Sequence, residues 1–473
     1  MIIRICTALG SGLLFFFAWS GHAWPLAWIA PLPVLWYAFG RSRWIDAASV
    51  AFTAFAVGGL YLCVVYRGSL PAGILAVGVG TMAILFALVV LGSKLVADRT
   101  SGVQAMLAYP VLVVTSELLV TCFSANGSFG SFAYSQVSFL PVIQIVSIAG
   151  LSGVSFVLAL VPSAIALALH RPAPQRKQLV VAAGTCLLAV LAFGLYELHR
   201  AVPSREVKVG LTASDEFPSA FRTEDATLAH SVISLYVTRV RALAQQGANI
   251  VVLPEEVVAS LPEWRKQLTA QLANVARENQ VTVVAGFRRW DGDTVRNAAE
   301  VYYPSPAPRQ EYFKQHLVPV LEDGISPGST TLVIPNDTGV AICKDMDFPE
   351  LGRRYSRAGA GLLLVPAWDF VSDGWLHASM AIMRGVEGGY SVARSARDGL
   401  LTATDQHGRL LASPVSSRGA HAVLVVSVPI GRGATTYSRI GDVFGWLCVA
   451  AAMWLLADAK TFAAQYRRSR NVN

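Results

Sequence analysis

Long apolar runs separated by short polar breaks fill the first 200 residues of this 473-residue chain, and one more apolar run lies near its end. A helix needs about 20 residues to cross about 30 Å of hydrocarbon, because each residue adds about 1.5 Å. The pattern therefore predicts eight membrane-spanning helices. They lie at residues 2–19, 24–40, 46–65, 71–91, 103–123, 138–169, 179–197 and 441–457.

Between the seventh and eighth apolar runs the pattern changes to that of a soluble domain. Short β-rich runs at 207–213, 249–255 and 281–287 alternate with helical spacing at 226–246 and 263–279. Strand-like and helical runs continue to alternate as far as "HAVLVVSVPI" at 421–430. Strands that alternate with helices indicate a layered α/β domain.

Three regions follow from these patterns. They are a seven-helix membrane domain at 1–200, an α/β domain at 206–430, and a last helix with a basic tail at 438–473. The composition agrees, since 54% hydrophobic and only 14% charged residues are unusual for a soluble enzyme.

Basic residues on alternate loops predict the orientation in the membrane. The positive-inside rule assigns these loops to the cytoplasm, so both termini are cytoplasmic and the α/β domain lies outside. Much of the net charge of +8 is therefore a topology signal, and we expect no nucleic-acid partner. The N-terminal run shows no small-x-small cleavage site before Trp24, which predicts an uncleaved anchor. The basic positions are Arg4, Arg41, Arg43, Lys94, Arg99, Arg171, Arg176, Lys177, Arg467, Arg468 and Arg470.

Cys343 is the cysteine that lies in the α/β region, whereas the other five lie in predicted spans. It has no soluble partner, which excludes a disulfide within its domain. The chain has no CxxC or HExxH motif, so we expect no metal site. Cys343 is then either a structural thiol or a nucleophile.

Three strand ends carry groups that suit acyl chemistry. Glu255 lies in "VVLPEE", Lys314 in "EYFKQHLVP", and Cys343 in "VAICKD". A glutamate can take the proton of a thiol, and a lysine can stabilise the charge that develops on an attacked carbonyl. The residues alone leave other readings open, since Glu255 and Glu256 could be a solvated strand end and Lys314 a surface lysine.

In this order and spacing, "LPEE", "FKQHLVPVLED" and "ICKDMDFPE" resemble the Glu–Lys–Cys series of the nitrilase (carbon–nitrogen hydrolase) superfamily. The segments 116–156, 373–389 and 435–446 are similar to apolipoprotein N-acyltransferases, its membrane-embedded members. The resemblance covers essentially the whole chain. It implies an α-β-β-α sandwich attached to about eight transmembrane helices.

The resemblance also implies roles. Cys343 would be the nucleophile, Glu255 the general base and Lys314 the oxyanion-stabilising residue. An acyl chain would pass from a phospholipid through a Cys343 thioester to the α-amine of a lipid-modified apolipoprotein. We expect a monomer without cofactors, in the bacterial inner membrane, with its catalytic domain on the periplasmic side. The supporting or substrate-binding positions implied are Glu322, Lys344, Asp345, Trp368 and Trp375.

Several segments depart from the family pattern. Lys344 and Asp345 follow the nucleophile where the family has Tyr and Glu, and "PAWDF" and "ARDG" replace the family's Asn-Asp-Ala-Trp-Phe and Asn-Asn-Gly. A lysine after Cys343 could lower the pKa of its thiol. The departures keep two other hypotheses open, which are a membrane-anchored amidase of the nitrilase type and a catalytically inactive binding protein.

Overall fold

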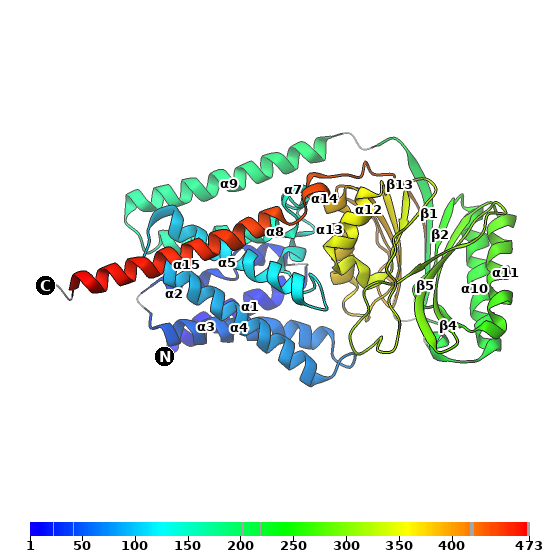
Figure 1. Ribbon diagram of the computed structural model, residues 1–473, viewed down its shortest axis with the longest axis horizontal. Coiled ribbons are helices and arrows are strands. Elements are labelled where there is room, and N and C mark those ends of the chain that lie inside the picture. Colours follow the sequence, from blue (N-terminus) through cyan, green and yellow to red (C-terminus); the bar gives the residue numbers. More distant parts are fainter. Residues whose placement is uncertain (22, 41, 201–202, 218, 417–420, 471–473) are drawn as a thin grey trace. The chain divides into compact units, whose positions relative to one another are not determined.

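The computed structural model describes the chain except for residues 22, 41, 201–202, 218, 417–420 and 471–473, and no side chain is described for residues 421 and 460–470. The chain divides into two compact units (Figure 1). One comprises Met1–Ser124, Gly130–His199 and Asp442–Asn473, and the other comprises Ala125–Phe129 and Arg200–Gly441. Arg41 and the side chains of Arg467, Arg468 and Arg470, which entered the orientation prediction, lie outside the described residues.

The first unit is helical. In it α1 packs on α3, α3 on α4, and α5 on both α8 and α15. Its elements are α1 (Ile2–Ala18), η1 (Trp24–Trp28), α2 (Leu32–Phe39), α3 (Trp44–Val65), α4 (Ala72–Ala97), α5 (Gly102–Phe123), η2 (Phe132–Gln136), α6 (Leu140–Ile143), α7 (Val146–Ala149), α8 (Leu151–Ala168), α9 (Ala173–His199) and α15 (Val443–Arg470).

Five helices of the described chain, α3, α4, α5, α8 and α9, are long and apolar enough to cross a membrane. The other three predicted spans are shorter apolar helices, Ile2–Ala18, Trp24–Phe39 and Val443–Ala459. The first part of the span predicted at 138–169 is also a short apolar segment, Leu140–Ala149. The helical unit is therefore confirmed, with a spanning count that is approximate.

Two predicted spans are interrupted for reasons that the sequence contains. The span predicted at 138–169 breaks at Gly150, whose φ of 62° is unfavourable for residues with a side chain, and only α8 continues at full length. The span predicted at 24–40 is a 3₁₀ turn followed by the eight-residue α2. Prolines at 25, 31 and 33 remove backbone donors there and favour helix starts.

The second unit contains two β-sheets. The larger has the order β13-β1-β2-β4-β5-β6, with β3 paired to β4, and the smaller has the order β12-β11-β10-β9-β8-β7. The strands are β1 (Glu206–Ser214), β2 (Ile250–Val252), β3 (Val258–Ser260), β4 (Thr282–Asp291), β5 (Thr294–Tyr302), β6 (Gln310–Phe313), β7 (Leu332–Ile334), β8 (Thr338–Val340), β9 (Leu362–Trp368), β10 (Ser391–Arg397), β11 (Thr402–Thr404), β12 (Leu410–Ala412) and β13 (His421–Pro429).

The sheets are the inner layers of an α-β-β-α sandwich, which confirms the predicted fold class. Helices α10 and α11 cover the outer face of the larger sheet, and α12 and α13 cover the smaller one (Figure 1). One core lies between the sheets, with Leu211 and Val252 from the larger and Leu363 from the smaller. The helical elements are η3 (Ala220–Arg222), α10 (Ala226–Gln245), α11 (Pro262–Glu278), η4 (Cys343–Asp347), α12 (Pro349–Arg357), α13 (Gly374–Gly388) and α14 (Thr436–Ile440).

Local signals fix the helix ends. The Asp225 side chain accepts hydrogen bonds from the N–H groups of Thr227 and Leu228 and caps α10. Pro262 begins α11, where a missing N–H costs nothing. Helix α13 ends at Gly389, which adopts a φ of 72°. These signals define where α10 and α11 begin and where α13 ends.

Candidate active site

The three residues singled out at strand ends all lie in the α/β unit. Glu255 follows β2 and Lys314 directly follows β6, both in the larger sheet. Cys343 follows β8 of the smaller sheet and begins η4. The charges of Glu255 and Lys314 both act on the pKa of the Cys343 thiol, so folding brings the three side chains together.

Glu255 and Lys314 belong to a buried network with Glu322. The Lys314 ammonium Nζ donates to Glu255 Oε1 and to Glu322 Oε2, both at 2.8 Å. Glu322 Oε2 also accepts from the backbone N–H of Val318 at 2.6 Å. Glu255 and Lys314 are 3% and 2% exposed, so neither is the solvated or surface residue that the sequence alone allowed.

Asn297 of β5 completes this network, although the sequence motifs did not point to it. Its Nδ2 donates to Glu255 Oε1 at 2.7 Å and to Glu322 Oε1 at 2.8 Å, and its carbonyl accepts from the N–H of Lys314 at 2.9 Å. No sequence signal distinguishes Asn297, which the structure shows to be 1% exposed within β5. The network holds two carboxylates, one ammonium and one amide away from water.

The charge state of Lys314 follows from its neighbours. Burial alone would lower its pKa, but the carboxylates of Glu255 and Glu322 raise the pKa well above the usual lysine range. Lys314 is therefore an ammonium at any physiological pH. It presents a fixed positive charge beside the thiol.

Cys343 has an unusual backbone conformation. Its φ of 41° is rarely adopted by residues with a side chain, and such conformations concentrate at functional sites. Its side chain is partly exposed, and its Sγ lies 3.4 Å from the carbonyl oxygen of Trp368. All six cysteines of the chain are free in the structure.

The Cys343 sulfur is a neutral thiol at rest. Desolvation and the Glu255 carboxylate raise its pKa well above the usual value, and Lys314 and Arg394 only partly oppose them. A thiol in this environment becomes a nucleophile only when a base takes its proton. Glu255 is the carboxylate whose charge acts on it most strongly.

Asp345 connects the turn of the nucleophile to the segment after Lys314. Its carboxylate accepts from the Tyr312 hydroxyl at 2.7 Å and from the backbone N–H groups of Gln315 and His316 at 3.1 and 3.0 Å. It also accepts from the N–H of Ile342 at 3.1 Å. The buried Asp345 therefore fixes both strand ends relative to each other.

Lys344, directly after the nucleophile, is buried. Its ammonium lies 2.9 Å from Asn126 Oδ1 and 3.5 Å from Asp347 Oδ2, and the cations that lower the pKa of the thiol are Lys314 and Arg394. These contacts link the segment 125–129 to η4.

The segment 125–129 makes further contacts with η4. Ser128 donates from its N–H and its hydroxyl to the carbonyl of Asp347. Gly127, at φ 53°, lies so close that a Cβ would be 2.7 Å from the same oxygen. This loop thereby supports the turn that carries Cys343.

The two tryptophans differ in their surroundings. The Trp368 ring packs edge-on against Phe221, with centroids 4.9 Å apart, and lies 4.0 Å below the Arg397 guanidinium. Its Nε1 donates to Asp398 at 2.9 Å, and its carbonyl contacts Cys343, so it borders the thiol. Trp375 is half-buried in the first turn of α13.

Asp369, Asp373 and His377 form a cluster near the thiol with ligand-like spacing. Asp369 is already bound by both guanidinium nitrogens of Arg394, one at 2.9 Å. Asp373 Oδ2 lies 2.9 Å from His377 Nε2. Burial lowers the pKa of His377, but the Asp373 carboxylate outweighs this effect and raises the pKa to about 9. Within the described structure these side chains therefore form a charge network, in which Asp369 pairs with Arg394 and Asp373 with His377.

Glu256 is also buried, although the sequence allowed it to lie at a solvated strand end. It is 2% exposed, with φ 45°, and its carboxylate pairs with the Arg288 guanidinium at 2.8 and 3.0 Å. Burial raises its pKa to about 7, although Arg288 opposes the shift. Glu256 therefore stabilises the loop that positions Glu255.

Comparisons with known proteins match both units. A model of the carbon–nitrogen hydrolase family covers residues 220–428, and one of the apolipoprotein N-acyltransferase N-terminal domain covers residues 11–164. The apolipoprotein N-acyltransferase of Geobacter metallireducens is 29% identical over 489 residues, 92% of this chain and 91% of that protein. That of Haemophilus influenzae is 23% identical over 480 residues, with the same shares.

Shorter matches concern the α/β unit. An omega-amidase of Mus musculus is 27% identical over 181 residues, 34% of this chain and 63% of that protein. A solved amidase of the nitrilase superfamily from Nesterenkonia has a TM-score of 0.41 and 20% identity, covering 50% of this chain and 95% of that one. The long matches, unlike these, include the helical unit as well. The chain therefore belongs to the apolipoprotein N-acyltransferase family.

Proposed function

We propose that this protein transfers a fatty acyl chain from a membrane phospholipid to the α-amine of the N-terminal diacylglyceryl-cysteine of apolipoproteins. The observation that carries the proposal is the buried network of Glu255, Lys314 and Glu322, in which the charges of Glu255 and Lys314 act on the Cys343 thiol. The names of the long relatives supply the acceptor class. The geometry of the network and the resemblance of its motifs support the catalytic roles proposed for these residues.

In the first half-reaction Glu255 takes the thiol proton of Cys343 as its sulfur attacks the ester carbonyl of the phospholipid. The hydrogen bonds that Glu255 accepts from Asn297 and Lys314 are both made by Oε1, so Oε2 is the oxygen suited to this transfer. The ester C–O bond then breaks, and the leaving lysophospholipid oxygen takes the proton back from Glu255. A thioester on Cys343 remains.

The tetrahedral intermediate carries a negative oxygen that needs preorganised donors. The Lys314 ammonium supplies a charge that needs no reorganisation, because Glu255, Glu322 and Asn297 hold its surroundings in place. The backbone N–H of Lys344 lies in the first turn of η4, where helical N–H groups lack carbonyl partners in their own helix. It is the second donor in the proposed oxyanion site.

In the second half-reaction the acceptor α-amine attacks the thioester carbonyl. Glu255 takes a proton from the amine, the C–S bond breaks, and the Cys343 thiolate recovers a proton. A thioester is already activated toward amines, so the transfer needs no cofactor or nucleotide. Trp368 and Trp375 are the proposed substrate-binding side chains beside the thiol, while Asp345 acts as a positioning residue.

The chain is a bacterial membrane protein. The loop charges support an orientation with both termini in the cytoplasm and the catalytic unit on the periplasmic side. In that orientation, donor and acceptor would both be anchored in the outer leaflet of the inner membrane. A monomer suffices for the proposed chemistry, because one chain supplies every residue named above.

A membrane-anchored amidase is the second candidate. It is favoured by the "PAWDF" and "ARDG" departures and by the match to an omega-amidase over 181 residues. In that case, water or a small amine, not a lipopeptide, would resolve the acyl-enzyme.

The test is intact mass spectrometry of the purified protein after incubation with phospholipid. We expect a fatty-acyl adduct that hydroxylamine removes and that Cys343→Ala lacks. Addition of a diacylated lipopeptide should clear the adduct and yield the triacylated peptide. An adduct cleared equally fast by water alone would favour the amidase, and absence of any adduct in the wild-type protein would refute the thioester.

A further inference from the structure

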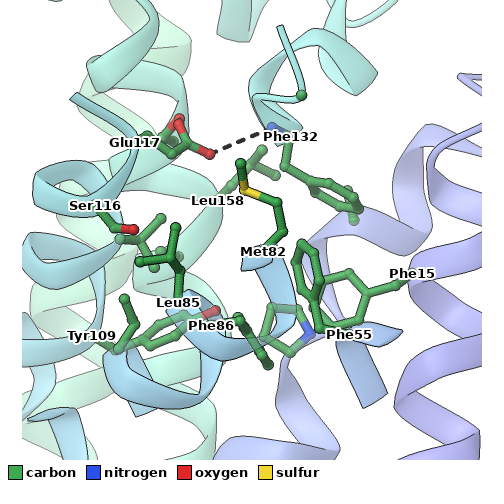
Figure 2. Close-up of a pocket in the computed structure, with 17 residues that line it drawn as sticks. Phe15, Phe55, Met82, Leu85, Phe86, Tyr109, Ser116, Glu117, Phe132 and Leu158 are labelled. Atoms are coloured by element: carbon green, nitrogen blue, oxygen red, sulfur yellow. Dashed lines mark hydrogen bonds between the residues drawn. The ribbon is translucent and has the colours of Figure 1, made fainter. Parts of the chain in front are cut away.

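A cavity of about 120 Å³ lies inside the helical unit. Its wall comes from α1, α3, α4, α5 and α8, together with the short segments that precede α2 and η2. It is partly open, and most of its lining side chains are apolar (Figure 2). The chemistry proposed for the α/β unit makes no use of it.

One side of the cavity is aromatic. The Phe15 ring contacts the rings of Phe55, Phe86 and Phe132, with centroids 5.5, 5.4 and 5.4 Å apart. Phe55 and Phe86 also contact each other at 5.1 Å. Mutually packed rings in tilted and edge-on arrangements are favourable and stiff, so this wall keeps its shape when the cavity is empty.

The polar side of the cavity is formed around Glu117. Figure 2 shows Glu117 and Ser116 across the cavity from Phe15 and Phe55, with Met82 between them. A carboxylate in a membrane helix is costly unless it is paired, and such groups usually mark function. Glu117 is therefore expected to have a role at this cavity.

The Glu117 carboxylate is occupied by protein donors. Oε2 accepts from the hydroxyls of Ser131, at 3.0 Å, and Ser155, and Oε1 accepts from the backbone N–H of Phe132 at 3.4 Å. These bonds tie the segment before η2 to α5 and α8. They place the Phe132 ring in the wall, so Glu117 shapes the cavity through Phe132.

We propose that this cavity binds the terminal segment of one acyl chain of a membrane phospholipid. An engineered apolar cavity of about 150 Å³ stays dry and binds benzene, so 120 Å³ suits the end of a hydrocarbon chain and not a whole lipid. The source of such a chain is the bilayer, because α3, α4, α5 and α8 have the length and apolarity of membrane spans. The inference concerns binding and is independent of the proposed acyl transfer.

Photolabelling of the full-length protein tests the proposal. The protein is placed in phosphatidylglycerol vesicles that contain a phosphatidylcholine with a diazirine at the end of one chain. We expect labels on wall residues such as Met82, Leu85 and Leu158. A second phosphatidylcholine, with the diazirine beside its ester, should leave these residues unlabelled.

A pair of variants on α4 sharpens the test. Met82→Trp fills the cavity and should abolish the wall labels, whereas Leu88→Trp, at a side chain that is 58% exposed, should keep them. Retention of the wall labels in Met82→Trp would overturn the proposal. So would wild-type protein labelled at exposed residues such as Leu88 but not on the wall, a result that requires no variant to fold.

Discussion

Replacement of Asn297 by leucine tests whether the buried network supports catalysis. The change keeps the approximate size of the side chain but removes the Nδ2 donor from Glu255, at 2.7 Å, and from Glu322, at 2.8 Å. Both acceptors are carboxylates that are at most 8% exposed, so water cannot easily replace the lost bonds. The two glutamates would then lose one of the two donors that they share and keep the Lys314 ammonium.

The expected magnitude follows from these two bonds. A hydrogen bond to a charged group contributes about 1.5–3 kcal/mol, so the loss of both costs about 3 kcal/mol or more. If that cost falls on the transition state, kcat/KM falls roughly 100-fold, because about 1.4 kcal/mol corresponds to tenfold. The lost hydrogen bonds stabilise the charged form of the two glutamates more than the protonated form. The acidic limb of the pH–rate profile should therefore move to higher pH.

The assay is acyl transfer from phospholipid to a diacylated lipopeptide, followed across pH. Asn274→Leu is the control, since that asparagine lies exposed on α11, where its Oδ1 accepts from Arg277 of the same helix. We expect the control to stay within about 0.5 kcal/mol of the wild type in stability. Activity of Asn297→Leu within threefold of wild type, with an unmoved acidic limb, would refute the role given to the network.

Three further changes probe the surroundings of the site. Gly286→Ala places a Cβ 2.4 Å from the carbonyl oxygen of Pro254 and 2.7 Å from the Glu255 Cα. We therefore expect about 1–3 kcal/mol of destabilisation and weaker acyl-enzyme formation. The control is Gly292→Asn, which lies in an open turn. His377 has its pKa raised from 6.5 to about 9, so it contributes about 3 kcal/mol of stability that is present below pH 6.5 and lost as the pH rises through 9. His377→Gln should therefore flatten the fall in unfolding temperature over this range, and an equally steep fall in the variant would contradict this assignment. Lys344→Met leaves the buried Asp347 without its ammonium and should cost about 3 kcal/mol, whereas the exposed Lys266→Met should leave the unfolding temperature unchanged.

Periodicity predicted most of the α/β unit because its elements are local and strongly patterned. The expected helices at 226–246 and 263–279 correspond to α10 and α11 within one residue at each end. The three-residue strands β3, β7 and β12 were missed, whereas β2, equally short, was recognised because it lies inside the longer β-rich run 249–255. Their pairing depends on partners far along the chain.

The site was only partly predictable for a related reason. Glu255, Lys314 and Cys343 were singled out by their places near strand ends and by the resemblance of their motifs to a Glu–Lys–Cys series, and the structure brings them together. Asn297 and Arg394 lie within strands, where the sequence gives no hint of which side chain they will meet. Cys343 was expected at a strand end, but β8 stops at Val340, and the φ of 41° that presents the thiol is a tertiary feature.

The support of η4 by residues 125–129 has a consequence for dissecting this protein. The rest of the α/β unit begins only at Arg200, so the unit is not a contiguous stretch of the gene. A fragment cut to residues 206–430 would keep both sheets but would lose Asn126 and Ser128, which bind Lys344 and Asp347. Such a fragment should fold with a loosened nucleophile turn, and adding a peptide of the missing loop should tighten it again.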